Sequence, residues 1–205
     1  MTTDNQTLIY LCGAHAAGKT TIRESLKNHP DVDYYNGVEI GKKLYYEAED
    51  NKNFTANQNE EFEKKITQME LARDADILQK AYKIAVVETW HVGNLAYAMK
   101  RNPNSADVLV KLAHTSPFFH KSFGIWLRVS KETIFQRTKT FSEDREWASE
   151  FYADIDSKIE LCFQMLGITN DNYCILDANR TLEKNINDVH NIIKFIAQGE
   201  LCQCI

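Results

Sequence analysis

The sequence predicts an α/β fold in three layers, with a five-stranded parallel sheet flanked by helices. Short apolar runs alternate along the chain with longer amphipathic segments, which is the pattern of parallel strands connected by helices. The run Ile84-Ala85-Val86-Val87 is continuously apolar, as expected of a central strand buried on both faces. The first apolar run is followed by a glycine-containing turn and then by a helical segment.

The individual elements follow from the same alternation. We expect strands at residues 8–12, 32–35, 84–88, 124–129 and 173–176. We expect helices at residues 20–28, 39–50, 57–80, 94–101, 105–113, 131–140, 146–166 and 181–197. No repeat or low-complexity linker is visible, so the sequence predicts a single domain over residues 1–205 with a short lid around residues 138–146. Ligands of such sheets bind beyond the carboxyl ends of the strands, which makes the residues after each strand functional candidates.

Composition restricts the classes of function. The chain has 205 residues, 43% of them hydrophobic and 26% charged, and its net charge is −5. These values are typical of a globular protein, and the negative charge argues against nonspecific binding to nucleic acid, which needs a basic surface. No apolar run approaches the roughly 18 residues that cross a bilayer, and the first residues lack the pattern of a signal peptide. We therefore expect a cytoplasmic protein whose partners include neither nucleic acid nor a membrane.

The five cysteines fit a reducing environment. Cys12, Cys162 and Cys174 lie in expected strands or helices, and we interpret them as buried free thiols. The last four residues, Cys202-Gln203-Cys204-Ile205, superficially suggest a prenylation box. Its two middle residues are not aliphatic, however, and no basic stretch precedes it. A metal site at Cys202 and Cys204 would lack a second pair of ligands, so the role of this tail stays open.

The glycine-containing turn carries the most specific motif of the chain. Residues 13–20 fit the pattern G-x-x-x-x-G-K-[ST] of the P-loop, in the strand–loop–helix context that the motif requires. The loop amides and the following helix N-terminus favour a bound phosphate. Lys19 is expected to contact the β- and γ-phosphates and Thr20 to bind Mg2+, so the motif predicts a P-loop NTPase fold with ATP and Mg2+ as cofactors. A purely structural glycine turn is the alternative. The expected cofactor-binding residues of this segment are Gly13, Ala14, His15, Ala16, Ala17, Gly18, Lys19, Thr20 and Thr21.

Glu88 closes the expected strand at residues 84–88 and is placed to face the phosphates across the P-loop. A carboxylate there can accept a proton from an attacking hydroxyl or order water around Mg2+, so we take Glu88 and Lys19 as catalytic candidates. The alternative is a carboxylate that caps the next helix. Trp90 follows in a polar, glycine-containing segment that suits a substrate-facing wall. The alternative is that its ring packs into the core.

Arg137 and Arg145 flank the expected lid. Arginines on a mobile flap deliver positive charge to a transferring phosphoryl group and exclude water, so both are catalytic candidates. The alternative is surface ion pairing, which suits Arg145 because it lies between Asp144 and Glu146.

Three further positions concern the acceptor and the base of the nucleotide. Glu39 follows the second expected strand and either binds hydroxyls of an acceptor or acts as a first-turn helix charge. Arg73, on a long charged helix, either contacts an acceptor or product phosphate or belongs to the solvated face. Asp177 and Asn179 follow the last strand, in a turn that either contacts the adenine ring, through side chains or backbone, or caps the next helix.

Taken together and in order, these segments resemble the deoxynucleoside kinase and thymidylate kinase group of P-loop proteins. The segments that carry the resemblance are the P-loop, Glu88 with Asn94-Leu95-Ala96-Tyr97, the stretch Ile125-Trp126-Leu127-Arg128-Val129-Ser130-Lys131-Glu132-Thr133 with Arg137, and Ile175-Leu176-Asp177-Ala178-Asn179. They cover most of the chain, and the resemblance implies a kinase fold and kinase chemistry. The chain departs from it at Thr89, where both families usually place an arginine, and after the second strand, where the familiar acceptor signatures are not recognisable.

The resemblance implies an ATP-dependent kinase whose small-molecule acceptor is a nucleoside or nucleotide. Thr89 motivates a second hypothesis, in which the acceptor is a sugar, vitamin or other metabolite. A third hypothesis is an ATP-binding NTPase or switch protein, although the chain has no Asn-Lys-x-Asp run of the kind that reads guanine in GTPases. The oligomeric state stays open, a homodimer included.

Overall fold

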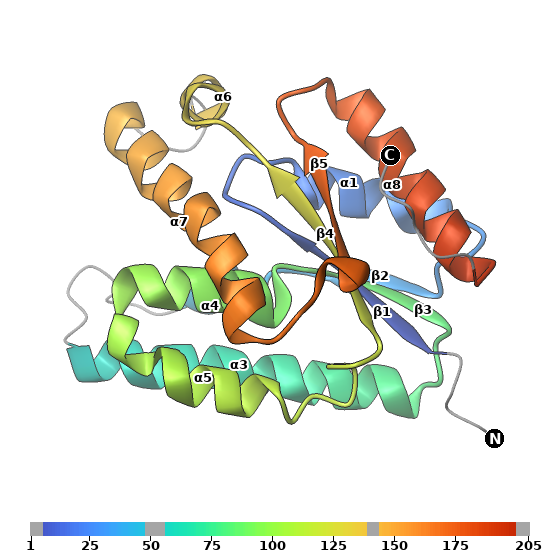
Figure 1. Cartoon of the computed structure of the whole chain (residues 1–205), viewed down its shortest axis with the longest axis horizontal. Helices are drawn as coiled ribbons and strands as arrows, with labels where there is room; N and C mark the ends of the chain where they lie inside the picture. The colour runs from blue at the N-terminus through green and yellow to red at the C-terminus, as the bar shows by residue number, and fades with distance from the viewer. Residues whose placement is uncertain (1–5, 48–55, 139–143, 200–205) are drawn as a thin grey trace.

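The computed structural model describes residues 6–47, 56–138 and 144–199. Its centre is a five-stranded sheet in the order β2-β3-β1-β4-β5, in which every neighbouring pair is parallel (Figure 1). The strands are β1 (Thr7–Cys12), β2 (Tyr34–Gly37), β3 (Ile84–Glu88), β4 (Ser122–Arg128) and β5 (Tyr173–Asp177). The predicted three-layer α/β fold with a parallel sheet is therefore confirmed. Residues 139–143 of the expected lid, and Cys202 and Cys204, lie outside the described residues, so the predicted lid stays a prediction.

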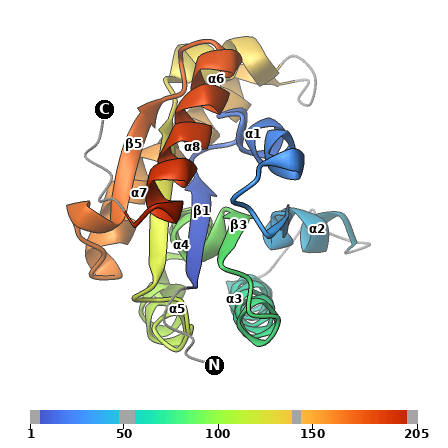
Figure 2. The same ribbon diagram turned by 90° about the vertical axis from the view of Figure 1, so that its right-hand side faces the viewer.

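Helices cover both faces of the sheet. The α-helices are α1 (Lys19–Ser25), α2 (Ile40–Glu47), α3 (Ala56–Gln79), α4 (Trp90–Arg101), α5 (Ala106–Ala113), α6 (Lys131–Arg137), α7 (Arg145–Met165) and α8 (Leu182–Ala197). Short 3₁₀ turns are η2 (Leu26–Asn28), η3 (Pro103–Ser105) and η5 (Asn170–Asn172). Helices α3, α4, α5 and α7 lie on one side of the sheet, and α1 and α8 lie on the other (Figures 1 and 2).

The central strand β1 explains why the core has two halves. Successive side chains of a strand point to opposite faces. Leu8 and Tyr10 accordingly join the cluster formed with α4, α5 and α7, whereas Ile9 and Leu11 join the cluster formed with α1 and α8. All four side chains are fully buried, which accounts for the unbroken apolar run in the sequence.

The P-loop lies where the order of the strands in the sheet reverses. The neighbours of β1 are β3 on one side and β4 on the other, so the connections on its two sides diverge. In open parallel sheets the crevice at such a point is where ligands bind. Residues 13–18 follow β1 directly and lie at this crevice.

Several elements start or end at other residues than expected, among them β4, α1 and α6. For two further elements the structure gives a reason. Strand β2 starts two residues later than expected, because Asp33 binds the backbone amides of Lys83 and Ile84 with its carboxylate, at 2.7 and 3.2 Å. Helix α4 starts four residues earlier, because Thr89 (φ 69°) and Trp90 (φ 48°) turn the chain sharply after β3. The α4 backbone therefore leaves directly from the end of the strand.

Gly37 at the end of β2 should be intolerant of substitution. A Cβ at this position would lie 2.5 Å from Val87 Cγ1 and 2.8 Å from the carbonyl oxygen of Val86. We expect Gly37→Ala to lower the free energy of unfolding by about 1–3 kcal/mol, the usual cost of an extra methyl group in a packed core. Chemical denaturation measures this, with Asn36→Ala, at an exposed site of the same strand, as the control. Equal stability of the two variants would contradict the close packing of β2 on β3.

Candidate active site

The loop between β1 and α1 has the backbone of a phosphate-binding turn. Gly13 has φ 142° and Gly18 has φ 97°, which are values that side chains rarely allow. A Cβ on Gly13 would also lie 2.5 Å from the carbonyl oxygen of Leu127, so a glycine is required there for two reasons. Ala16 has φ 66° as well. The loop is thus bent tightly around its own interior.

Lys19 occupies that interior. Its ammonium group donates hydrogen bonds to the carbonyl oxygens of Gly13 and Ala14, both at 2.8 Å. The side chain is almost completely buried. The loop therefore holds a positive charge at a fixed position, beside the backbone amides that follow Gly13.

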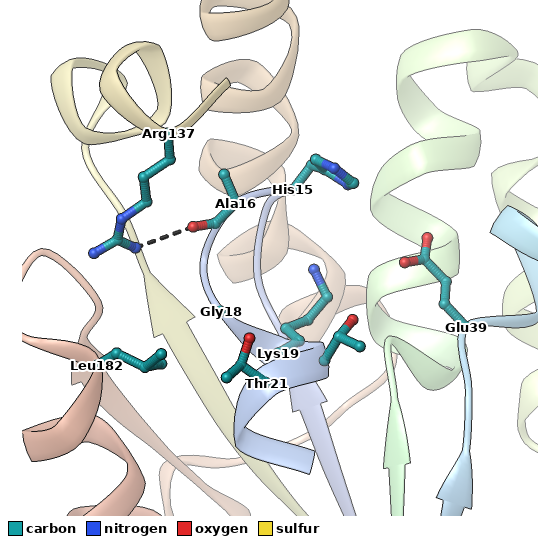
Figure 3. Close-up of a pocket in the computed structure, with 9 residues that line it drawn as sticks. His15, Ala16, Gly18, Lys19, Thr21, Glu39, Arg137 and Leu182 are labelled. Carbon is teal, nitrogen blue, oxygen red and sulfur yellow. Dashed lines mark hydrogen bonds between the residues drawn. The ribbon is translucent and has the colours of Figure 1, made fainter. Parts of the chain in front are cut away.

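A pocket of about 350 Å³ opens in front of the P-loop. Figure 3 shows side chains that line it, with Glu39 on one side and Arg137 on the other. The lining residues are His15, Ala16, Gly18, Lys19, Thr20, Thr21, Glu39, Arg137 and Leu182. The structure therefore brings Glu39 and Arg137, far apart in the sequence, to the same cavity as the P-loop.

Glu88 lies at the carboxyl end of β3 and is buried. Its Oε2 accepts a hydrogen bond of 2.9 Å from the Thr20 hydroxyl. Its Oε1 accepts a hydrogen bond of 2.6 Å from Nε of Arg23, on the next turn of α1. The sequence reasoning missed Arg23; its only signal was the spacing of four residues after Lys19, which places two cations one turn apart on the same helix.

Glu39, just before α2, faces the P-loop across the pocket (Figure 3). Burial raises the pKa of its carboxyl group, and the nearby Glu88 raises it further, while Lys19 opposes both. Among the described residues, no hydrogen bond or ion pair holds this carboxylate. Glu39 is thus a carboxylate that is available to a ligand of the pocket.

Arg137, the last residue of α6, bridges two loops of the site. Its guanidinium donates to the carbonyl oxygen of Ala16 at 3.0 Å and to that of Ala178 at 2.9 Å. Ala178 belongs to the turn between β5 and α8, and Thr181 caps α8 by accepting a hydrogen bond from the amide of Lys184. Arg137 therefore connects the P-loop to the turn that the sequence assigns to the adenine side.

Asp177 and Asn179 lie in that turn but line a different groove. Asn179 accepts a hydrogen bond of 2.9 Å from the amide of Ser130, and Asp177 accepts one of 2.9 Å from the amide of Asn179. Both residues line a groove of about 760 Å³ beside Trp126 and Asp156, rather than the pocket in front of the P-loop. Their side chains join the ends of β4 and β5.

The structure does not bring Arg73 and Arg145 to the pocket. Arg73 pairs with Glu70 and donates to the carbonyl oxygen of Val38 at 2.9 Å. Arg145 donates to the carbonyl oxygen of Phe135 at 2.6 Å and lies 3.9 Å from the centre of the Phe135 ring. Both guanidinium groups join protein segments, so neither is directed at the site in this conformation.

Trp90 lies in the core rather than on the pocket wall. Its side chain is fully buried and stacks on Tyr10, with ring centres 4.7 Å apart. Its indole N–H donates to the carboxylate of Asp74, which also accepts a hydrogen bond of 2.6 Å from the Ser116 hydroxyl. The structure thus agrees with the alternative in which the Trp90 ring packs into the core.

The imidazole of His15 stacks on Tyr152 of α7, with ring centres 5.1 Å apart. Burial, together with the charges of Lys19 and Lys42, lowers the pKa of His15 from 6.5 to about 4. Between these two pH values the unfolded chain binds a proton that the folded chain does not. The stability contributed by the neutral ring is therefore present above pH 6.5 and is lost as the pH falls towards 4.

We expect His15→Phe to remove this pH dependence. The phenyl ring keeps the stack on Tyr152 but has no proton to bind, so the variant should lose less stability than the wild type between pH 6.5 and pH 4. Chemical denaturation at four or five pH values measures both proteins. The two proteins share all other titrating groups, so the difference between their curves of unfolding free energy against pH reports on His15. Parallel curves would contradict the lowered pKa of His15.

The described residues contain neither a protein-only metal site nor a membrane span. Among them, no group of three or more His, Cys, Asp or Glu residues is placed to hold a metal ion. None of their helices is both long and apolar enough to cross a bilayer. Cys12, Cys162 and Cys174 are buried and form no disulfide with one another.

Fold and site together define a P-loop protein, with the phosphate-binding turn between β1 and α1 of a parallel sheet. A family model described as an AAA domain matches residues 9–155, which is more than two thirds of the sequence. The chain therefore belongs to this family of AAA domains. No curated protein sequence matches the chain.

Solved structures share the fold at low sequence identity. NadR protein in complex with NR matches with a TM-score of 0.62 at 13% identity, over 92% of this chain and 51% of that one. This chain therefore spans about half the length of NadR. Deoxyadenosine kinase from M. mycoides with bound dATP matches with a TM-score of 0.56 at 15% identity, over 92% of this chain and 100% of that one. At these identities the comparisons show the fold.

Proposed function

We propose that this protein is an ATP-dependent phosphotransferase that moves the γ-phosphoryl group of ATP to a hydroxyl group of a small molecule, a nucleoside in the first place. The observation that carries the proposal is that the P-loop cation Lys19 and the carboxylate of Glu39 line one pocket. Within the described part of the chain, no hydrogen bond or ion pair holds Glu39. The kinases among the structural neighbours support the same chemistry.

The P-loop side would hold the donor. The loop amides and Lys19 would bind the phosphates, and the Thr20 hydroxyl would bind Mg2+. Because Thr20 donates its proton to Glu88, its oxygen lone pairs stay available to a cation, which fits this role. Bound Mg2+ neutralises charge on the β- and γ-phosphates. Arg137 would hold α6 against the donor, and the turn that contains Ala178, whose carbonyl oxygen Arg137 binds, would border the base.

Glu88 and Glu39 would have different roles in the reaction. Glu88 is occupied by Thr20 and Arg23, which favours the second of its expected roles, the ordering of Mg2+ and its water. Glu39 is unoccupied among the described residues and has a raised pKa. Glu39 would therefore orient the acceptor hydroxyl and accept its proton as the hydroxyl oxygen bonds to phosphorus and ADP leaves.

The charges around the acceptor side favour an uncharged acceptor over a nucleotide. The three arginines of this region in the described residues are each paired with a carboxylate: Arg23 with Glu88, Arg73 with Glu70 and Arg101 with Glu63. An acceptor phosphate bound by an arginine would need one of these pairs to open. A nucleoside, or a sugar or vitamin as the alternative, offers a hydroxyl group and carries no phosphate.

A panel of acceptors tests this proposal. Purified protein with Mg2+ and ATP is incubated with ribo- and deoxynucleosides, their monophosphates, and a set of sugars and vitamins, and products are identified by mass spectrometry. We expect a monophosphate product from at least one nucleoside. Products formed only from sugars or vitamins would replace the nucleoside with the alternative acceptor class. No product from any compound, by protein that binds ATP, would contradict the transferase.

A further inference from the structure

Glu88 accepts hydrogen bonds from two side chains, Thr20 and Arg23, that lie in different surroundings. The hydroxyl of Thr20 belongs to the P-loop, and its oxygen is the expected ligand of Mg2+. Arg23, by contrast, is 3% exposed and is not among the nine residues that line the pocket. The two oxygens of one carboxylate thus connect a buried arginine to the metal-binding hydroxyl.

Arg23 itself is fixed from three directions. Its Nε donates to Glu88 at 2.6 Å, one terminal nitrogen donates to the carbonyl oxygen of Tyr35 at 2.8 Å, and the other pairs with Glu24. Tyr35 lies in β2, so the guanidinium links α1 to two strands. A planar group held at all three nitrogens cannot turn towards a phosphate without losing these bonds. Arg23 is therefore built as a fixed countercharge rather than as a phosphate ligand.

The position after Glu88 cannot supply that charge. Thr89 has φ 69° and is fully buried. A Cβ on Gly93 of α4 would lie 2.6 Å from the Thr89 methyl group, so the side chain at position 89 points into the start of α4. A longer, charged side chain has no space there.

We propose that Arg23 is the positioning residue of the magnesium site: it fixes the ionised Glu88 so that the carboxylate holds the Thr20 hydroxyl in the orientation that binds Mg2+ with the nucleotide. This inference rests on the proposed function only for the identity of the bound group, Mg2+ with ATP. The arginine acts through Glu88 and touches neither substrate nor reacting atoms. Its effect should therefore appear in the contribution of Mg2+ to nucleotide binding.

Calorimetric titration of ATP with and without Mg2+ tests the proposal. In Arg23→Met the affinity for ATP in the presence of Mg2+ should fall about tenfold or more, as is typical when a partner behind a metal ligand is lost. The affinity measured in EDTA should change much less, because the loop amides and Lys19 are untouched. Arg23→Lys keeps the charge and should retain an intermediate affinity with Mg2+. Lys80→Met, which removes an exposed ion pair with Asp76, is the matched control and should change neither value.

Stability gives a second measurement that needs neither Mg2+ nor an acceptor. A single Arg23→Met change leaves Glu88 buried without a countercharge, so it should lower the denaturation midpoint strongly. The double variant Arg23→Met with Glu88→Gln removes both charges and should recover part of the loss. If Arg23→Met proves too unstable for titration, the double variant is titrated beside Glu88→Gln alone.

The two proposals fail in different ways. Unchanged Mg2+-dependent ATP affinity in Arg23→Met, or strictly additive stability effects of Arg23→Met and Glu88→Gln, would overturn the role of Arg23. The role of Arg23 would also be overturned if Glu88→Gln lowers the Mg2+-dependent affinity for ATP and the double variant lowers that affinity about tenfold further. Arg23 would then act independently of Glu88. An inactive acceptor panel, by contrast, would overturn only the transferase, because ATP binding and stability are measured without an acceptor.

Discussion

Lys19→Ala is expected to reduce kcat/KM for phosphoryl transfer on the order of 100- to 1000-fold, the range found when one preorganised electrostatic group is removed from an active site. The physical reason is the position of the ammonium group, which the carbonyl oxygens of Gly13 and Ala14 fix inside the phosphate-binding loop at 2.8 Å. Initial rates with the acceptor found in the panel measure the loss. Affinity for ATP should fall as well.

The fold should survive this change. The Lys19 side chain bonds only to its own loop in the described structure, and each neutral acceptor that it leaves costs about 1 kcal/mol. Thermal unfolding of the variant should therefore show a single transition close to that of the wild type. Lys80→Ala, at an exposed ion pair at the end of α3, is the control for removal of a lysine. Full activity in Lys19→Ala would refute the donor site.

Glu39→Gln is expected to lower kcat by about 100-fold or more, because a positioned general base contributes roughly 100- to 10,000-fold. Glutamine keeps the size and polarity of the side chain but cannot accept the proton of the acceptor hydroxyl. Because Glu39 makes no bond to the P-loop among the described residues, the dissociation constant for ATP should change less than about threefold. Rapid-quench measurement of product separates this loss in the chemical step from product release.

The exposed Glu150, which pairs with Lys131 on the surface, provides the matched control. Glu150→Gln should leave kcat unchanged. If Glu39→Gln retains wild-type kcat while Glu88→Gln loses turnover without any change in Mg2+-dependent ATP binding, then Glu88 is the base and the division of roles proposed above is wrong.

The fold could be predicted from the sequence because its strongest signals are local. The run at residues 84–88 contains only apolar residues before its final glutamate, and it forms β3 with the expected ends. The P-loop motif is equally local, and it predicted the turn after β1. Strand β2 was displaced because its start depends on a side-chain contact of Asp33 with residues 50 and 51 positions away, which no local pattern encodes.

The candidate site was only partly predictable because the sequence does not show which group an arginine side chain binds in the folded protein. Arg73 and Arg145 were candidates through their positions, yet their guanidinium groups bind Glu70 and the backbone of Phe135. Arg23 was not a candidate, although it pairs with the strand-end carboxylate Glu88. The pairing of Arg23 with Glu88 could not be predicted from the sequence, since the two residues meet only through the packing of α1 against β3.

The central claim is that the γ-phosphoryl group of ATP is transferred to a small molecule and not merely to water. ATP labelled in the γ-phosphoryl group is incubated with the protein and a small-molecule cell extract, in parallel with Lys19→Ala, and the label is followed by chromatography and mass spectrometry. The account predicts that the wild type, and not the variant, places the label on a small molecule that gains one phosphoryl group. Label released only as inorganic phosphate, at a rate that no small molecule increases, would contradict it and favour the NTPase or switch alternative.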